Sequence, residues 1–157
     1  MKLYCVRHGE ALTADVDPEC SLTEKGVADI TKVSKFLARY SLHVDHVMHS
    51  PKKRAVQTAG ILSENIHCDV SAEESALLTP DADVHEMVSC VNTWGQDTMI
   101  VSHLPFIGNL VSQLVTGTIE AMPIVNFTPG TIVCLHFYEQ KRWMINWLLR
   151  PDLIVNG

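Results

Sequence analysis

Apolar residues follow two different patterns along this chain. Residues 2–7 contain the continuous apolar run Leu3-Tyr4-Cys5-Val6, and shorter apolar stretches lie within residues 45–49 and 97–101. Strands that are buried on both faces have continuous rather than alternating apolar sequences, so each of these segments predicts a buried β-strand. A weaker run at residues 67–70 predicts a further strand.

The second pattern, in which apolar residues recur every three or four positions, predicts helices between these strands. It is clearest within residues 24–40. The apolar positions of that segment are Val27, Ile30, Val33, Phe36, Leu37 and Tyr40. Either Ser21 or Thr23 is expected to cap this helix.

Three further helices are predicted from their start and stop signals. Ser50 and the proline after it supply an N-cap and a first helical position, for a helix that runs to about Glu64. A shorter helix is expected over roughly residues 83–92. The last helix begins at Pro105 and ends at Gly117, a residue suited to a C-terminal cap.

Two β-rich runs at residues 131–138 and 142–149, joined by a short polar connection, predict an antiparallel hairpin. Trp143 and Trp147 are expected to lie on one face of its second strand. Strands that alternate with helices predict an α/β fold. We expect a three-layer sandwich with a mainly parallel central sheet, helices on both faces and a C-terminal antiparallel hairpin.

Composition narrows the classes of protein that fit. The chain has 157 residues, 46% of them hydrophobic, which suits a single domain over residues 1–157. A net charge of −6 argues against nucleic acid binding through broad electrostatics. The five cysteines are scattered, so reduced thiols are expected rather than disulfides or a metal site. The N-terminal apolar run is too short for a signal peptide or a membrane span, and we expect a cytoplasmic protein without a cofactor.

Three segments, each directly after a predicted strand, contain polar and charged residues that neither an apolar core nor an ordinary surface requires. These segments are Arg7-His8-Gly9-Glu10, the stretch from Ser50 to Arg54, and Ser102-His103. In open α/β sheets, ligands bind in the crevice outside the carboxyl ends of the strands. A parallel sheet would therefore bring all three segments to one site.

The side chains of these segments suit a multiply charged oxyanion. Two arginines, Arg7 and Arg54, and two histidines, His8 and His103, offer more donors than a carboxylate would need, and phosphate fits them better. Gly9 is either a plain turn residue or a point where the backbone approaches the anion, and its neighbours favour the second interpretation. Ser102 adds a polar group for substrate binding.

The same residues resemble the histidine phosphatase, or phosphoglycerate mutase-like, superfamily. The resemblance begins at Arg7-His8-Gly9-Glu10 and continues, in the family's order, over nearly the whole chain. The further matching blocks are Leu22-Thr23-Glu24-Lys25-Gly26, Ser50-Pro51-Lys52-Lys53-Arg54-Ala55-Val56-Gln57-Thr58-Ala59 and Ser102-His103-Leu104-Pro105. Length and block spacing are most similar to the short bacterial phosphohistidine phosphatases of the SixA type.

The resemblance implies a role for each of the four charged or titratable residues. His8 would attack phosphorus in line, while Arg7, Arg54 and His103 would hold the equatorial oxygens. Phosphoryl transfer depends mainly on positioning and charge neutralisation, and a covalent phospho-enzyme divides one difficult displacement into two easier ones. The bound phosphate is expected to favour a protonated His103, although a helix N-terminus disfavours it.

No residue can be assigned from sequence as the acid that protonates a leaving group. Larger members of the superfamily carry such an acid in an inserted region, which this chain lacks. Glu10 and Glu74 are the candidates, either as the acid or as supporting residues behind the site. A phosphohistidine substrate can be cleaved without an acid, because imidazole is a good leaving group at neutral pH.

The leading hypothesis is a phosphohistidine phosphatase. It would act on a His-phosphorylated phosphotransfer protein through a covalent phosphohistidine intermediate and release inorganic phosphate. A short chain without a lid leaves an open site, which fits a phosphate on a protein surface. One alternative is a phosphatase or mutase for small phosphomonoesters, and another is a phosphate-binding regulatory module without activity.

Overall fold

The computed structural model describes residues 1–68, 70–119, 123–139 and 142–155. In this part of the chain, six strands form one sheet in the order β5-β3-β6-β1-β7-β8. Their bounds are β1 Lys2–Arg7, β3 His46–His49, β5 Glu73–Glu74, β6 Thr98–Ser102, β7 Ile132–Tyr138 and β8 Arg142–Leu149. Strands β5, β3, β6 and β1 are mutually parallel, whereas β7 and β8 run antiparallel to their neighbours.

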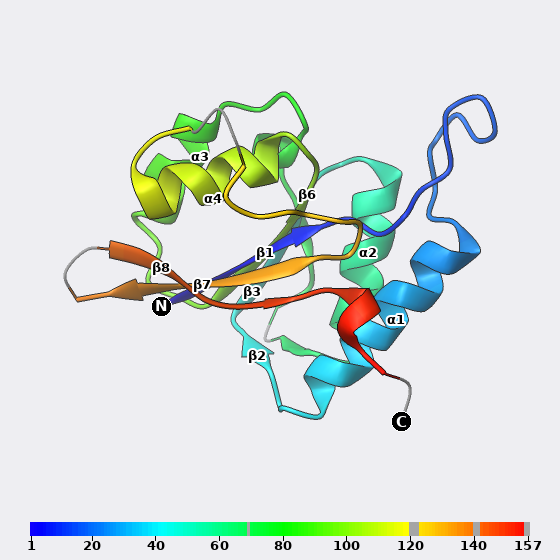
Figure 1. Cartoon of the computed structure of the whole chain (residues 1–157), viewed down its shortest axis with the longest axis horizontal. Helices are drawn as coiled ribbons and strands as arrows, with labels where there is room; N and C mark the ends of the chain where they lie inside the picture. The colour runs from blue at the N-terminus through cyan, green and yellow to red at the C-terminus, as the bar shows by residue number, and fades with distance from the viewer. Residues whose placement is uncertain (69, 120–122, 140–141, 156–157) are drawn as a thin grey trace.

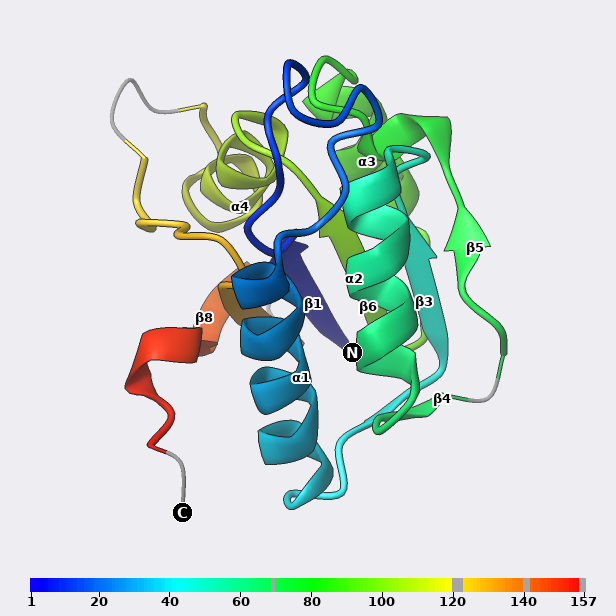
Figure 2. The same cartoon turned by 90° about the vertical axis from the view of Figure 1, so that its right-hand side faces the viewer.

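Helices cover both faces of this sheet, as Figures 1 and 2 show. Helices α1 (Glu24–Ala38) and α2 (Lys53–Ser63) lie on one face, and α3 (Val84–Val91) and α4 (Phe106–Thr116) lie on the other. The short 3-10 helices η1 (Ala76–Leu78) and η2 (Pro151–Leu153) complete the described helical segments. The predicted three-layer α/β fold with a C-terminal antiparallel hairpin is therefore confirmed.

The core consists of two apolar layers, one on each side of β1. Leu3 and Cys5 pack toward α3 and α4, while Tyr4 and Val6 pack toward α1 and α2, and all four are buried. Successive strand side chains point to opposite faces, so a strand covered on both faces must be apolar throughout. This explains the continuous apolar run at the N-terminus.

The helix starts differ from the expectations in one case that matters for the site. Of the two candidate caps for α1, Thr23 is the one used, and its Oγ1 accepts the N–H of Gly26 at 2.9 Å. The second helix begins at Lys53 rather than directly after Ser50, so the prediction that Ser50 caps it is wrong. The Ser50 hydroxyl is instead bonded to His103. Gly117 ends α4 with a left-handed φ of 83°, as predicted.

The weak strand prediction at residues 67–70 is only partly correct. Strand β4 (His67–Cys68) pairs with β2 (His43–Val44) in a separate small sheet, and residue 69 lies outside the described residues. The edge of the main sheet is formed by β5 instead, which pairs with β3. A two-residue strand has no periodicity of its own, and its pairing depends on a neighbour distant in sequence.

The prediction that Trp143 and Trp147 share one face of β8 is wrong. The pairing register shifts between Cys134, which pairs with Trp147, and Leu135, which pairs with Ile145. Asn146 is thus an extra residue, a β-bulge that reverses the alternation of side chains. Trp143 consequently packs in the layer of α3 and α4, whereas Trp147 packs in the layer of α1 and α2.

Candidate active site

Three neighbouring parallel strands end at the same edge of the sheet and bring the predicted segments together. Arg7 at the end of β1 pairs with Ser102 at the end of β6, and His49 at the end of β3 pairs with Val101. The residues that follow are His8, Ser50 and His103. The rings of His8 and His103 lie 4.9 Å apart between their centroids, at an interplanar angle of 55°.

His8 is held by contacts that leave one nitrogen able to act as a nucleophile. Its backbone N–H is donated to the Ser102 carbonyl at 3.0 Å, and its Nδ1 lies 2.7 Å from the Gly9 carbonyl. Arg54 donates its Nε–H to Nε2 of His8 at 3.2 Å. A carbonyl only accepts and a guanidinium only donates, so the proton is on Nδ1 and the lone pair is on Nε2.

Burial keeps His8 neutral over the physiological pH range. The side chain is 9% exposed, and burial lowers its pKa from 6.5 to about 4, with smaller contributions from the charges of Arg54 and Arg7. The hydrogen bond to the Gly9 carbonyl opposes this shift because it stabilises the protonated ring. A neutral imidazole with an unprotonated Nε2 is the nucleophilic form.

The two arginines approach His8 from different elements. Arg54 lies in the first turn of α2, and its guanidinium reaches back toward the strand ends, the direction in which helical side chains lean. Arg7 donates from Nη1 to the Phe127 carbonyl at 2.6 Å, whereas its buried Nε has no partner among the described residues. Burial lowers the pKa of Arg7, although an arginine remains charged at neutral pH.

His103 is almost fully enclosed, with 1% of its surface exposed. Its Nε2 lies 2.7 Å from the Ser50 hydroxyl oxygen, and its Nδ1 is buried without a partner among the described residues. Burial is the main cause of a pKa lowered to about 3, and the charges of Arg54, Lys52 and Arg7 and the neighbouring His8 act in the same direction. In the ligand-free protein His103 is therefore neutral, not protonated.

Gly9 and Ser102, expected to bind substrate, have other contacts. The Gly9 N–H is donated to Thr58 Oγ1 at 3.0 Å, and a Cβ on Gly9 would lie 2.9 Å from Ile30 Cγ1. The glycine is thus explained by close packing against α1. The Ser102 hydroxyl is buried and donates to the Leu78 carbonyl at 2.7 Å, which ties η1 to the end of β6.

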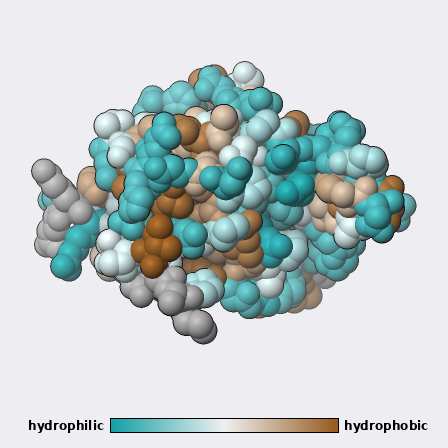
Figure 3. Space-filling view, turned by 90° about the horizontal axis from the view of Figure 1, so that it is seen from above, coloured by the Kyte–Doolittle hydropathy of each residue, from teal (hydrophilic) through white to brown (hydrophobic). Residues whose placement is uncertain are grey.

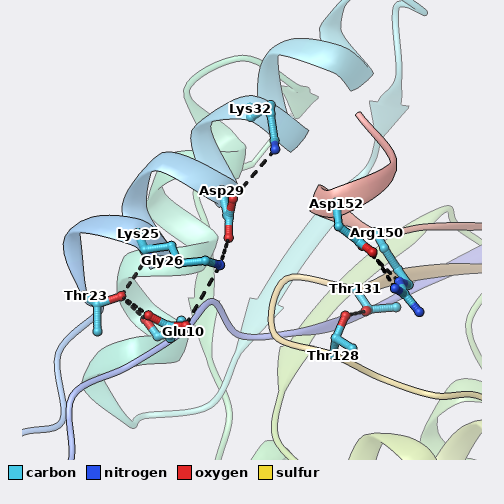
Figure 4. Close-up of polar contacts among 10 residues, drawn as sticks. All are labelled: Glu10, Thr23, Lys25, Gly26, Asp29, Lys32, Thr128, Thr131, Arg150 and Asp152. Atoms are coloured by element: carbon cyan, nitrogen blue, oxygen red, sulfur yellow. Dashed lines mark hydrogen bonds and ion pairs between the residues drawn. The ribbon is translucent and has the colours of Figure 1, made fainter. Parts of the chain in front are cut away.

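The two candidate acids lie in different surroundings. Glu10 lines the cavity beside His8, and its Oε1 accepts the Thr23 hydroxyl at 2.8 Å while Lys25 lies 3.9 Å from Oε2. Figure 4 shows this carboxylate turned toward the start of α1. Glu74 is exposed on the edge strand β5, beside His49. Of the two, only Glu10 contributes to the cavity.

The cavity beside His8 has a volume of about 380 Å³. It is lined by Arg7, His8, Glu10, Ala11, Leu12, Cys20, Arg54 and Pro129. Part of its wall is the loop between β1 and α1, which extends away from the sheet in Figure 1 and is closed by a bond from Leu12 N to the Ser21 carbonyl at 2.8 Å. Residues of this wall reach the site from segments far apart in sequence.

Sequence reasoning missed three contributors to the site. The sequence places Ser50 in a candidate site segment but does not predict its contact with His103, it assigns no role to Thr58, and it leaves the segment leading into β7 unassigned. Gly130 in that segment donates its N–H to the His8 carbonyl at 3.0 Å, and the neighbouring Pro129 lines the cavity. The turn sequence Thr128-Pro129-Gly130 was the available signal, but a turn by itself does not indicate what lies next to it.

On the face shown in Figure 3, hydrophilic residues cover most of the area, with smaller hydrophobic areas between them. Within the described ranges, none of the helices has the length and apolar character needed to cross a lipid bilayer.

Comparison with known proteins identifies the class to which this fold and site belong. The model of the histidine phosphatase superfamily (branch 1) matches residues 3–76. The chain is also 30% identical over 156 residues to the phosphohistidine phosphatase SixA of Escherichia coli (strain K12), covering 96% of this chain and 94% of that protein. The chain belongs to the histidine phosphatase superfamily, and it is accordingly a hydrolase that acts on phosphoryl groups.

Within the superfamily, the chain is similar to proteins of the SixA type over nearly its whole length. A solved structure of the protein histidine phosphatase SixA complexed with tungstate matches with a TM-score of 0.87 at 28% identity, covering 99% of this chain and 100% of that one. A phosphoserine phosphatase from Entamoeba histolytica matches with a TM-score of 0.74 at 13% identity, covering 98% and 99%. The second likeness shows a shared fold only.

Proposed function

We propose that this protein is a phosphohistidine phosphatase that removes the phosphoryl group from a His-phosphorylated phosphotransfer protein, with His8 as the nucleophile. The observation that carries this proposal is the pair of contacts on His8. Nδ1 donates to the Gly9 carbonyl, and Nε2 keeps its lone pair beside Arg54. A neutral imidazole fixed in this way is ready to attack phosphorus.

In the first step, Nε2 of His8 forms a bond to phosphorus while the bond between phosphorus and the substrate imidazole breaks. The electron pair of that bond goes to the departing nitrogen, which takes up a proton from water. Arg7, Arg54 and His103 are assigned to the three equatorial oxygens, where the two arginines neutralise the charge of the transferring group and His103 donates a hydrogen bond. The Nδ1–H bond to the Gly9 carbonyl stabilises the positive charge that the phosphorylated His8 ring carries.

In the second step, a water molecule attacks the phosphorus of the phosphorylated His8. The bond between phosphorus and Nε2 breaks, its electron pair returns to Nε2, and inorganic phosphate leaves as H2PO4⁻ with both protons of the attacking water. Arg54 can then restore its hydrogen bond to the regenerated lone pair. The residues begin and end the cycle in the same protonation states.

Two features support a phosphohistidine protein as the substrate. The cavity has one carboxylate in its wall, Glu10, and that group is already bonded to Thr23, which suits a leaving group that needs no strong acid. The relatives named above include a phosphohistidine phosphatase and a protein histidine phosphatase bound to tungstate, a tetrahedral oxyanion.

The proposal is tested by phosphorus NMR on a mixture of a phosphohistidine-carrying phosphotransfer domain and a sugar phosphate. We expect wild-type protein to release phosphate from the phosphohistidine first, through an acid-labile phospho-enzyme. His8→Ala should release none, and His85→Ala, which removes an exposed histidine of α3, should match wild type. Equal rates for wild type and His8→Ala would overturn the proposal.

The same experiment separates the two alternatives. Faster turnover of the sugar phosphate would identify a small-molecule phosphatase or mutase. Tight binding of the phosphoprotein without phosphate release would identify a regulatory module.

A further inference from the structure

Ser50 and His103 form a buried pair behind the nucleophile. Ser50 follows β3, His103 follows β6, and both side chains are almost completely buried. The Ser50 oxygen lies 2.7 Å from Nε2 of His103 and 3.3 Å from the backbone nitrogen of Lys52. The hydroxyl is therefore the only side-chain group bonded to His103 within the described residues.

The contacts of this hydroxyl indicate where its hydrogen points. The Lys52 N–H can only donate, so it occupies a lone pair of the Ser50 oxygen. The hydroxyl hydrogen then finds an acceptor in Nε2 of His103. The reverse arrangement, with a proton on Nε2, would leave the Ser50 hydrogen without an acceptor in a buried position, which is costly.

An acceptor at Nε2 determines the tautomer of the whole ring. In a neutral imidazole, the hydrogen bond made by one nitrogen sets which nitrogen carries the proton. Since burial keeps His103 neutral, its proton must be on Nδ1. That nitrogen is buried and has no partner among the described residues, and the His103 ring lies 4.9 Å from the His8 ring.

We propose that Ser50 is a positioning residue that fixes His103 as the Nδ1–H tautomer, so that Nδ1 donates a hydrogen bond to the phosphoryl group at His8. This inference rests on the proposed function for the phosphoryl group but assigns Ser50 a role of its own. A lone pair at Nδ1 would repel an anionic oxygen, whereas a hydrogen there completes the donors of Arg7 and Arg54 without adding another charge.

The test uses inorganic phosphate as the ligand and four proteins: wild type, Ser50→Ala, Ser50→Thr and Ser34→Ala. Ser34 is a matched control, because it is a fully buried serine whose hydroxyl donates to the Ile61 carbonyl at 3.0 Å on another part of the molecule. The tautomer of His103 is measured from long-range proton–nitrogen NMR spectra of its imidazole ring. Phosphate affinity is measured as the inhibition constant.

We expect wild type, Ser50→Thr and Ser34→Ala to show a protonated Nδ1 and equal inhibition constants. Ser50→Ala should shift the proton toward Nε2 and raise the inhibition constant about tenfold, the ratio for loss of one hydrogen bond to a charged group. A protonated Nε2 in wild type would overturn the proposal, and this measurement does not require any variant to fold. An unchanged tautomer and inhibition constant in folded Ser50→Ala would also overturn it.

The outcome is independent of the phosphoprotein assay. Because inorganic phosphate is the probe, a chain that does not hydrolyse phosphohistidine can still show the expected tautomer. In that case the proposed function fails and the role of Ser50 stands.

Discussion

Arg54 donates its Nε–H to Nε2 of His8 over 3.2 Å, so the free protein holds its cation against the nitrogen that we propose as the nucleophile. The bond keeps Nε2 unprotonated and orients the ring. A phosphoryl group that arrives at Nε2 must replace this contact, and its oxygens offer the guanidinium stronger acceptors than the imidazole does.

Removal of the Arg54 side chain should weaken catalysis far more than removal of its neighbour. Arg54→Ala loses a charge-assisted contact to the phosphoryl group of about 1.5–3 kcal/mol, so kcat/KM should fall roughly 10- to 100-fold. Lys53→Ala removes an exposed charge from the same turn of α2 and is the control. Steady-state kinetics on both variants make the comparison, and equal losses would contradict a specific role for Arg54.

Activity should persist in mild acid and fall only near pH 4. The folded pKa of His8 is lowered to about 4, so Nε2 stays unprotonated above that value and the nucleophile is lost as the pH falls through it. A rate profile measured on a substrate that is stable in acid would test this. Loss of activity already at pH 6.5, the ordinary pKa of histidine, would show that burial does not control the nucleophile.

Stability should decrease over a wider acid range, beginning below about pH 6.5, where activity is still expected to persist. The unfolded chain binds protons on these two histidines below about pH 6.5, whereas in the folded protein His8 and His103 resist protonation until about pH 4 and 3. The unfolded state thus binds more protons in this window, and the free energy of unfolding falls as the pH is lowered through it. Thermal denaturation at several pH values measures this effect. The melting temperature of His103→Gln should depend less on pH than that of wild type.

Gly26 should tolerate no side chain, although it lies in a helix. A Cβ there would lie 2.1 Å from the Glu10 carbonyl oxygen, so Gly26→Ala must displace the backbone that follows His8 and should cost about 1–3 kcal/mol. Gly60 in α2 has no atom within 4 Å of its Cβ position, and Gly60→Ala should stabilise by about 0.5–1 kcal/mol. Chemical denaturation of both variants measures their free energies of unfolding. If helix propensity alone set these values, both substitutions would stabilise the protein by similar amounts.

Glu10→Gln should retain phosphohistidine turnover within about threefold, since a true general acid contributes at least about 100-fold. The glutamine can still accept the Thr23 hydroxyl that Glu10 now binds. Glu74→Gln, on the exposed edge strand, should behave in the same way. Kinetics with a phosphohistidine protein would decide, and a loss above 100-fold for either variant would identify it as the missing acid.

Local patterns were sufficient for most of the architecture. The apolar run at residues 2–7 corresponds to β1, because a strand buried on both faces is apolar throughout. The recurrence of apolar residues at residues 24–40 corresponds to α1, because a helix buried on one face repeats every three or four positions. The order of strands and helices also placed Arg7, Ser50 and Ser102 at strand ends. A parallel sheet collects such ends at one edge, so the location of the site was already implied.

The sequence by itself thus determined the class of fold, the family and the edge of the sheet where chemistry is expected, since these depend on neighbours within a few positions. Only the tertiary structure decided that the Ser50 hydroxyl meets His103, 53 positions away, and that Gly9 packs against Ile30. It also decided, through the bulge at Asn146, which layer receives Trp147. Hydrogen bonds and close packing join residues distant in the chain, and no local period encodes their partners.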